Sequence, residues 1–455
     1  MKFTAFCSFL DIDGHHYLFN TLNSALIELD EERYKKLKEA FYLNNLDTLG
    51  IEEKNILVDN GFLIEDTVDE YLSIRNRYLS SKYNVSHDLK LDIAVTNKCN
   101  FSCIYCFERF FDDKISLKAD DEVKSKFYDS LMKYLNHMIT NYKVKSLQVT
   151  WYGGEPSLDW TLILHLNEEL IKFSNKYHIL YKNLIVTNGF LIDEDIANKL
   201  SFQNIDYVQI TVDGPEIIHN KRRPLANGKE TYSKILEGIY NLLKNGINTV
   251  VRVNIDKGNV DFLEVLIEEL FDRFQVFVEK ELLSLDFARV FGYKDSFPIS
   301  EFYSKRKNIM KKAIKLGFIK PSLESNGIGA FCNAEADTLS SLTLDIFGNI
   351  YKCWNYVFVK DVSYYTLDKL IQNNFEILPQ NKNRLDYVEK LSLLNVNKGE
   401  CLKCKYIAYC GGLCPDVRKK IINGEEENVY ENEKCKLIVE DLIKEQIRIL
   451  YNTEK

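Results

Sequence analysis

Between about residue 90 and residue 292, short apolar stretches alternate with longer amphipathic ones. The short stretches are rich in β-branched and aromatic residues, as buried parallel strands are, and the longer ones have the periodicity of helices that expose one face. Six repeats of this unit predict an α/β fold in which helices wrap parallel strands, a barrel or partial barrel. The predicted strands are 91–96, 146–152, 183–188, 207–213, 249–255 and 285–291, and the helices between them include 121–142, 160–177, 231–245 and 260–274.

Residues 1–85 have a different pattern, in which short strands and short helices follow one another. Segment 1–10 is apolar, but Asp11 and Asp13 follow at once, so it predicts a first strand and not a signal peptide. Together the elements of this segment predict a winged-helix-like module. The further elements are a hairpin of runs 17–20 and 25–29, a helix capped by Asp30, a helix at 51–60 that stops at Gly61, a strand at 62–65 and a linking helix opened by Asp66.

Polar residues follow the predicted barrel strands where each strand ends. Cys99 follows the first, Gly153-Gly154-Glu155-Pro156 the second, Asn188-Gly189 the third and Asp213-Gly214 the fourth. In barrels of parallel strands, sites gather at the carboxyl ends of the strands. We therefore expect a site at this edge.

The composition is that of an ordinary globular protein, since 45% of the 455 residues are hydrophobic and 28% are charged. The 27 Tyr and 27 Phe offer ample apolar area to bury, which excludes a disordered chain. A net charge of −8 disfavours sequence-independent binding to nucleic acid, and a local basic groove is the alternative that stays open. No window reaches about 18 uninterrupted apolar residues, so we expect no membrane span. These features predict a cytoplasmic protein without a nucleic-acid or membrane partner.

The eleven cysteines are the most informative part of the composition. An odd number in a long chain without a signal peptide argues against a secreted disulfide framework, and clustered cysteines in a reducing cytosol more often bind metal or do redox chemistry. Cys7 stands alone and is expected to be a buried free thiol. The other ten form two groups, Cys99, Cys103 and Cys106, and Cys332, Cys353, Cys401, Cys404, Cys410, Cys414 and Cys435.

The first group has the spacing C-x3-C-x2-C over residues 99–106. A structural zinc site takes four ligands, and a cubane iron–sulfur cluster normally takes four cysteines. With three thiolates, one iron of a cubane is left for another ligand to bind. A zinc site completed by a distant His or Cys is the alternative.

This spacing, with the aromatic Tyr105 before the third cysteine, resembles the radical S-adenosylmethionine superfamily. The resemblance implies a partial (β/α)6 barrel with a [4Fe-4S] cluster on Cys99, Cys103 and Cys106. It also implies that S-adenosyl-L-methionine chelates the open iron and is cleaved to a 5′-deoxyadenosyl radical, which removes a hydrogen atom from the substrate. A reductant protein of flavodoxin or ferredoxin type is the expected partner.

Further motifs resemble the nucleotide-binding segments of this family, each with a structural alternative. Glu155, in the glycine–glycine–glutamate motif, is expected at the methionine amino group, and Arg252 at the methionine carboxylate. The alternatives are a solvated Glu155 in a turn and a barrel-end salt bridge of Arg252. Asp213 is expected to face the cavity and to bind substrate or ribose, as the candidate catalytic residue, whereas His219 is expected to be structural. The resemblance assigns cofactor binding to Tyr105, Gly153, Gly154, Glu155, Thr187, Asn188, Asp213, Arg252 and Asn254.

The second cysteine group, C-x15-G-x4-C followed by C-x2-C-x5-C-x3-C and a last Cys, resembles the SPASM domain, which carries two auxiliary [4Fe-4S] clusters. Seven thiolates are one short of the eight that two cubane clusters take. We expect the inner cluster to have a non-cysteine ligand or an open iron that takes a substrate thiolate. A zinc ribbon is the alternative. By the family's pattern, Cys401, Cys404, Cys410 and Cys435 bind the outer cluster, and Cys332, Cys353 and Cys414 the inner one.

Four segments follow from these patterns: a peptide-recognition module (1–85), a radical SAM partial barrel (86–292), a helical bridge (293–330) and a SPASM domain (331–455). The front module resembles leader-binding elements of peptide maturases, although a scaffold or dimerisation element is the alternative. The leading hypothesis is a maturase that forms a thioether cross-link in a ribosomally made precursor peptide with a leader sequence. The alternatives are formylglycine formation of the anaerobic sulfatase-maturating type, carbon–carbon or carbon–oxygen cyclisation, epimerisation, and a non-enzymatic iron–sulfur electron carrier or sensor.

Overall fold

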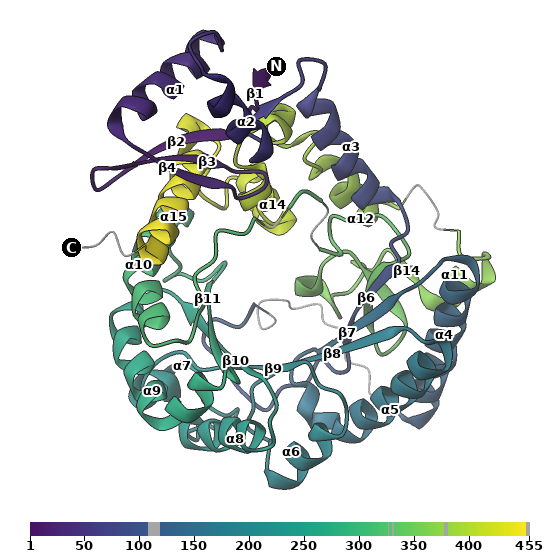
Figure 1. Ribbon diagram of the computed structural model, residues 1–455. Coiled ribbons are helices and arrows are strands. Elements are labelled where there is room, and N and C mark those ends of the chain that lie inside the picture. The colour runs from purple at the N-terminus through teal and green to yellow at the C-terminus, as the bar shows by residue number, and fades with distance from the viewer. Residues whose placement is uncertain (108–118, 326, 330–331, 377–380, 452–455) are drawn as a thin grey trace. The chain divides into compact units, whose positions relative to one another are not determined.

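The computed structural model describes the chain except for residues 108–118, 326, 330–331, 377–380 and 452–455 (Figure 1). Contacts group the chain into two compact units. The first unit combines Met1–Asn84, Lys320–Phe331 and Glu389–Lys455, and the second combines Val85–Ile319 and Cys332–Val388. The four segments predicted from the sequence are contiguous, whereas these units are interleaved along the chain, and the predicted segment bounds stay a prediction.

The second unit is built on one curved sheet in the order β11-β10-β9-β8-β7-β6-β12-β13-β14 (Figure 1). Strands β6 to β11 are parallel neighbours in chain order, which confirms the predicted partial barrel. β12 adds to β6 in parallel, and β13 and β14 continue antiparallel. The strands are β6 Asp88–Ala94, β7 Ser146–Tyr152, β8 Leu180–Thr187, β9 Tyr207–Thr211, β10 Thr249–Ile255, β11 Leu283–Arg289, β12 Ser341–Asp345, β13 Asn349–Tyr351 and β14 Tyr365–Thr366.

Helices cover the outer face of this sheet (Figure 1). Burial alternates along β10, where Val251 and Val253 are fully buried in the main core and Arg252 and Asn254 are partly exposed. One face of β10 therefore packs in the core, and the other carries polar residues. The helices are α4 Asp121–Asn141, α5 Trp160–Tyr177, α6 Glu194–Ser201, α7 Glu216–Arg222, α8 Tyr232–Lys244, α9 Leu263–Glu279, α10 Ile299–Lys315, α11 Leu367–Gln372 and α12 Lys382–Leu385.

Aspartate caps fix where several of these helices begin. The side chains of Asp120, Asp159 and Asp193 accept hydrogen bonds from backbone N–H groups in the first turns of α4, α5 and α6. Such a cap satisfies a backbone donor that the helix itself leaves unpaired. The predicted helices 121–142 and 160–177 are confirmed almost to the residue, because a cap and an amphipathic repeat coincide in each.

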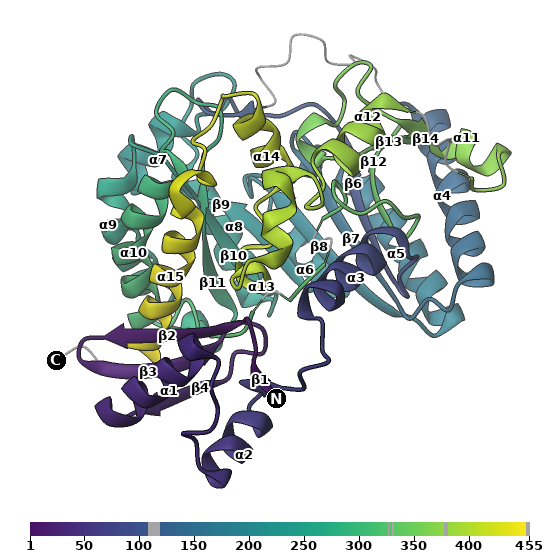
Figure 2. The ribbon, with the colours of Figure 1, turned by 90° about the horizontal axis from the view of Figure 1, so that it is seen from above.

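The first unit contains a three-stranded antiparallel sheet, β2-β3-β4, and a pair, β1-β5. Its C-terminal helix α15 packs on the sheet through Ile443 and Ile447, in one apolar cluster with Leu10 and Ile12 (Figure 2). The strands are β1 Lys2–Phe3, β2 Cys7–Ile12, β3 His15–Asn20, β4 Leu26–Leu29 and β5 Leu63–Ile64, and the helices are α1 Glu31–Leu43, α2 Ile51–Asp59, α3 Glu70–Tyr83, α13 Ile407–Cys410, α14 Pro415–Ile422 and α15 Lys434–Tyr451.

Most predicted elements at the amino end are confirmed. Asp30 caps α1 by accepting from the backbone of Arg33, and α2 ends before Gly61, whose φ is +71°. Two predictions were wrong in detail. The apolar start forms two strands, β1 and β2, and helix α3 is capped by Asp69 and not by Asp66. Both aspartates precede the same apolar repeat, so sequence spacing alone did not separate them. Within the described residues, no helix is long and apolar enough to span a bilayer.

Candidate active site

Cys99, Cys103 and Cys106 lie on the loop that follows β6, at the carboxyl edge of the parallel sheet. The backbone N–H of Phe101 donates to Cys99 Sγ over 3.4 Å. Cys99 is partly open to solvent and Cys103 is buried. Desolvation by the surrounding atoms, with a smaller effect of the neighbouring thiols, raises the pKa of Cys99 to about 12 and that of Cys103 to about 11. A raised pKa means that the thiolate forms are disfavoured in the protein alone. The positive charge of a bound metal stabilises thiolates, and cysteines bind a cluster as thiolates.

The three-cysteine loop is held along its length by the segment that follows α7. Ser102 N donates to Pro224 O over 2.8 Å, and Ile104 N donates to Arg222 O over 3.0 Å. A third bond joins Ala226 N to Asn100 O over 2.8 Å. The loop therefore has a defined backbone shape although it is neither helix nor strand.

The glycine loop after β7 packs against the same three-cysteine loop. Gly154 N donates to Thr96 O and Glu155 N to Lys98 O, each over 2.8 Å. A Cβ on Gly153 would lie 2.4 Å from Thr96 O, and one on Gly154 would lie 2.5 Å from Lys98 O. These positions require glycine because two backbones meet there.

Glu155 is almost fully buried, with 1% of its surface exposed. It accepts from Ser157 N over 2.9 Å, from Asn188 N over 2.7 Å and from the Thr187 hydroxyl. Burial raises the pKa of Glu155, and these hydrogen bonds oppose the shift. The alternative of a solvated Glu155 in a turn is therefore wrong, because this carboxylate joins the loops that follow β7 and β8.

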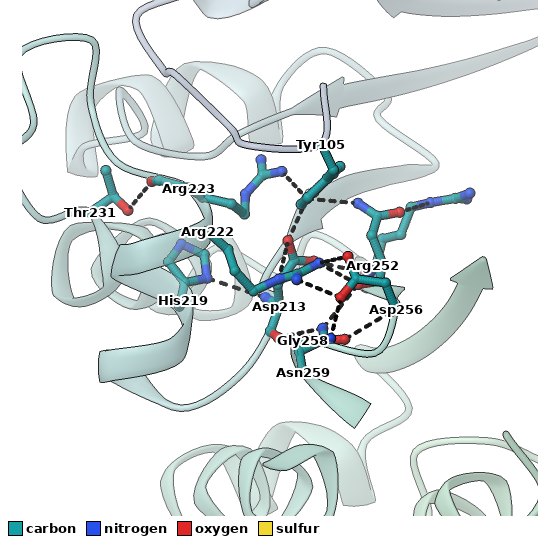
Figure 3. Close-up of polar contacts among 11 residues, drawn as sticks. Tyr105, Asp213, His219, Arg222, Arg223, Thr231, Arg252, Asp256, Gly258 and Asn259 are labelled. Carbon is teal, nitrogen blue, oxygen red and sulfur yellow. Dashed lines mark hydrogen bonds and ion pairs between the residues drawn. The ribbon is translucent and has the colours of Figure 1, made fainter. Parts of the chain in front are cut away.

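Tyr105 places its hydroxyl at the centre of a buried network (Figure 3). The hydroxyl donates to Asp213 Oδ2 and accepts from Arg223 Nη1 over 2.6 Å and from Asn254 Nδ2 over 3.1 Å. The Arg222 guanidinium lies 4.9 Å from the centre of the Tyr105 ring. A residue between two of the cysteines is thus fixed to the carboxyl ends of β9 and β10.

Asp213 differs from the expectation that it faces a cavity, because its side chain is fully buried. Asp213 Oδ1 accepts from Asn254 N over 2.9 Å, and Oδ2 lies 3.7 Å from Arg222 Nε. His219 Nδ1 accepts from Asp213 N over 3.2 Å, and burial, Arg223 and Arg222 hold the pKa of His219 well below its usual range. Both carboxylate oxygens of Asp213 are thus engaged within the network, and the burial of His219 agrees with the structural role expected of it.

Arg252 forms the salt bridge that the sequence left as an alternative. Its Nη1 lies 2.9 Å from Asp286 Oδ2 on the neighbouring strand, and its Nε donates to Asn254 Oδ1 over 3.3 Å. Both partners of the salt bridge are partly exposed on the polar face of the sheet. The pair links β10 to β11 at one level of the barrel.

Two members of the network, Asp256 and Asn259, were missed in the sequence. Asp256 takes a bidentate contact from Arg222 at 2.7 and 2.9 Å, and Asn259 Nδ2 donates to Asp213 O over 2.7 Å. Both are fully buried. Both residues follow the end of the fifth predicted strand, as polar residues follow the first four predicted strands. This position could have identified them as candidate site residues.

Arg223 provides a further test of whether the site fits an iron–sulfur cluster. The side chain is 7% exposed, and its buried Nε has no hydrogen-bond partner among the described residues. The charge of Arg223 lowers the pKa of Cys103 against the effect of burial. A buried N–H donor beside a thiol suits a sulfur acceptor, so these residues fit a cluster.

The second cysteine group is divided between the two units. Cys401, Cys404, Cys410 and Cys435 in the first unit are close enough to affect one another electrostatically. Gly412 N donates to Cys410 Sγ over 3.3 Å. No three His, Cys, Asp or Glu side chains of the described residues gather around the position of one metal ion. Cys414 belongs to the first unit, and Cys332 and Cys353 to the second.

Comparisons with known proteins agree with this geometry. Residues 93–270 match the family model of the Radical SAM superfamily. The chain is 22% identical over 434 residues to the radical SAM cyclopropyl synthase TigE of Paramaledivibacter caminithermalis, an alignment covering 88% of this chain and 86% of TigE. It is 24% identical over 346 residues to a cysteine-type anaerobic sulfatase-maturating enzyme of Clostridium perfringens, covering 70% and 85%. The solved structure of native anSMEcpe with bound AdoMet has a TM-score of 0.54 at 20% identity, covering 80% of this chain and 99% of that one.

The matched segment begins in β6 and ends in α9, so it contains the three-cysteine loop and the strands that surround it. This chain carries a radical SAM domain, as the cysteine spacing predicted. Its homologues include a cyclopropyl synthase and sulfatase-maturating enzymes, and its barrel has the fold of the latter.

Proposed function

We propose that this chain is a radical S-adenosylmethionine maturase that forms a thioether bond within a ribosomally made precursor peptide. One observation carries the proposal: the three-cysteine loop at the end of β6 is bonded along its backbone to the glycine loop after β7 and to the segment after α7. Such a pre-shaped loop is what a three-cysteine cluster site beside a nucleotide requires. A function restricted to structural zinc binding does not need the glycine loop.

Cys99, Cys103 and Cys106 would hold a [4Fe-4S] cluster in this proposal, with S-adenosylmethionine at its open iron. That bound pair supplies the radical that removes a hydrogen atom from the substrate. The chain's own residues fix the surroundings, since Glu155 joins two loops and Tyr105 ties the three-cysteine loop to β9 and β10. The nucleotide contacts expected from the resemblance, including those of Gly153, Thr187, Asn188 and Arg252, remain part of the proposal.

The second cysteine group supports auxiliary clusters. We assign the outer cluster to Cys401, Cys404, Cys410 and Cys435, and an inner cluster with an open iron to Cys332, Cys353 and Cys414. A substrate thiolate at that iron would be activated for bond formation to carbon, since metals lower thiol pKa values. The electron paramagnetic resonance spectrum of this cluster should change when a cysteine-bearing peptide is added, and an unchanged spectrum would argue against thiolate binding.

The amino-terminal sheet supports a peptide substrate. β2 and β4 each pair only with β3 among the described strands, so each has a free edge to which an extended leader peptide can add as a strand. Hydrogen exchange of the full chain with and without leader peptide tests this role. Slower exchange in β2 or β4 supports the assignment, and unchanged exchange at a saturating concentration contradicts it.

Carbon–carbon ring closure is the second candidate, because TigE, named a cyclopropyl synthase, aligns with 88% of this chain. A thioether and a new carbon–carbon bond each remove two hydrogen atoms from the peptide, so mass alone does not separate them. Alkylation of the product distinguishes the two bonds, because a thioether consumes a cysteine thiol and a carbon–carbon bond leaves every thiol free. A formylglycine product, as the sulfatase-maturating relatives suggest, would instead carry an aldehyde that reacts with a hydrazide.

Anaerobic incubation with a reductant, S-adenosylmethionine and the precursor peptide tests the proposal as a whole. The expected products are 5′-deoxyadenosine and a peptide that has lost two hydrogen atoms and one thiol per link. An electron carrier or sensor would yield neither product. The proposed reductant is a flavodoxin- or ferredoxin-type protein, and the proposed location is the cytoplasm.

A further inference from the structure

Two arginines and two aspartates belong to the buried network that includes Tyr105, and their pairing is uneven. Arg222 is matched by Asp256, with contacts of 2.7 and 2.9 Å, and lies 3.7 Å from Asp213. Arg223, by contrast, donates to the neutral Tyr105 hydroxyl over 2.6 Å and forms no ion pair with a carboxylate in the described part of the chain. One positive charge in this buried network is therefore left without a directly bound counter-charge.

The backbone fixes where this unmatched charge lies. Arg223 N donates to His219 O over 2.8 Å, and the Thr231 hydroxyl donates to Arg223 O over 2.7 Å. The next residue, Pro224, accepts from Ser102 N in the three-cysteine loop. Arg223 therefore has little freedom to move away from that loop.

The side chain of Arg223 lies among residues of the three-cysteine loop. Its guanidinium is 5.7 Å from the centre of the Phe101 ring, and its Nη1 bonds to Tyr105. Cys103 is on the same loop, between these two contacts in sequence, and is 8% exposed. Because little water reaches this region, the attraction between Arg223 and negative charge at Cys103 is weakly screened.

The buried Nε of Arg223 remains as an unused donor. A buried guanidinium N–H without a partner costs free energy unless an acceptor arrives. The sulfur atoms of a cluster bound at Cys103 are such acceptors. Hydrogen bonds and positive charge near cluster sulfurs favour the reduced form, which carries one more negative charge.

We propose that Arg223 is a positioning residue that donates a hydrogen bond to sulfur at the Cys103 side of the cluster and raises its reduction potential. This inference rests on the proposed cluster at Cys99, Cys103 and Cys106. Arg223 thereby makes the electron that starts catalysis easier to supply, without contacting the peptide.

Potentiometric titration of the full-length, anaerobically loaded protein tests the effect of charge. The signal of this cluster is identified by its change on addition of S-adenosylmethionine and by its absence from a variant with Cys99, Cys103 and Cys106 all replaced by Ala. For Arg223→Gln we expect the ratio of reduced to oxidised cluster at a fixed potential to fall about tenfold, which is about 59 mV for a one-electron couple. Arg223→Lys should restore most of this ratio, and Tyr105→Phe, which keeps the charge, should alter it less than Arg223→Gln.

An unchanged potential in Arg223→Gln with a fully loaded cluster would overturn the inference and leave the proposed function intact. Equal shifts in Arg223→Gln and Arg223→Lys would also overturn it, because charge would then not be the cause. Absence of iron and sulfide from the three-cysteine loop of the unaltered protein would instead refute the proposed function.

A second measurement does not depend on whether Arg223→Gln folds. In the unaltered protein labelled with nitrogen-15 arginine, pulsed paramagnetic resonance of the reduced cluster should show coupling to a labelled nitrogen. Arg223→Lys should abolish the coupling although Arg222 remains. No coupling in the unaltered protein would contradict the proposed hydrogen bond.

Discussion

The two cysteine regions each contain a buried arginine, but they use it differently. Arg418 in the first unit is fully buried and donates to three backbone oxygens, of Gly412, Leu391 and Gly411, over 2.8, 2.9 and 2.9 Å. Arg223 in the second unit has one described hydrogen bond from its guanidinium and an unused buried Nε. The first arginine holds a loop together, whereas the second has a buried N–H without a hydrogen-bond partner among the described residues.

Under the proposed function, this difference corresponds to one supporting site and one reacting site. Arg418 also lowers the pKa of Cys401 against the effect of burial, so both arginines place positive charge beside a thiol. Only the three-cysteine loop lies at the carboxyl edge of a parallel sheet, where active sites of such folds lie. We infer that the Arg418 region stores or passes electrons and that the Arg223 region does the bond-breaking chemistry.

Removing the thiols of the three-cysteine loop should have the largest effect. Replacing Cys99, Cys103 and Cys106 together by Ala should reduce 5′-deoxyadenosine formation to background, because no other described cysteines lie on that loop. Chromatography of quenched anaerobic reactions measures this. Replacing Cys401 alone should leave cleavage of S-adenosylmethionine detectable, and equal loss in both variants would erase the proposed distinction.

Arg418→Met should destabilise the protein more than Arg223→Gln does. It would leave the buried carbonyl oxygens of Leu391 and Gly411 without the donor that Arg418 supplies, whereas Gly412 O keeps the Tyr430 hydroxyl, and we expect a cost of about 3 kcal/mol of unfolding free energy. Denaturant unfolding of the unloaded proteins measures the difference. Arg33→Met is the matched control, because Arg33 is an arginine of the same unit that is exposed together with its partner Asp30, and we expect less than about 1 kcal/mol there. A smaller loss for Arg418→Met than for the control would contradict the structural role of Arg418.

Gly154→Ala should weaken S-adenosylmethionine binding about tenfold, which corresponds to about 1.4 kcal/mol. The new Cβ would lie 2.5 Å from Lys98 O, so the glycine loop must move away from the three-cysteine loop. Equilibrium dialysis of the loaded enzyme reports the affinity. Gly246→Ala provides the control, since Gly246 has a φ of +73° and open space around it. Equal affinity in both variants would show that the contact between the loops is dispensable for binding.

The smallest effect is expected at Cys7, whose thiol should not react with an alkylating reagent in the native protein. It is 3% exposed, and burial, with a smaller effect of Glu70, raises its pKa to about 12. Its thiolate is therefore scarce at pH 8, and iodoacetamide should label it only after unfolding. Peptide mass spectrometry of the native, unloaded protein measures this labelling. Rapid labelling of native Cys7 would show that the amino-terminal sheet opens.

The sequence predicted the barrel well because each strand and helix has its own local signal. β7 and β10 have the predicted bounds, and α5 does too. The helices α6 and α7 were missed because they have only 8 and 7 residues, too few for a clear amphipathic repeat. The buried Cys7 was predicted correctly from its isolation in an apolar segment.

The sequence predicted which cysteines share one loop, and their role as cluster ligands stays a prediction, whereas most polar contacts of the site had no signal in the sequence. Spacing brought Cys99, Cys103 and Cys106 together, since they share one loop. The burial of Asp213 and the salt bridge of Arg252 with Asp286 depend on which strands are neighbours. Long-range pairings such as Tyr105 with Asp213, 108 residues apart, have no local signature. Arg223 directly follows Arg222 in the sequence, but its lack of a carboxylate partner among the described residues depends on the fold.

The central claim is that the three-cysteine loop binds a four-iron cluster whose open iron takes S-adenosylmethionine. Paramagnetic resonance of the dithionite-reduced, anaerobically purified protein tests it most directly, with the variant lacking Cys99, Cys103 and Cys106 as reference. We predict a cluster signal that is absent from the variant and that changes when S-adenosylmethionine is added. Zinc at this loop without iron or sulfide, or a signal indifferent to S-adenosylmethionine, would contradict the claim.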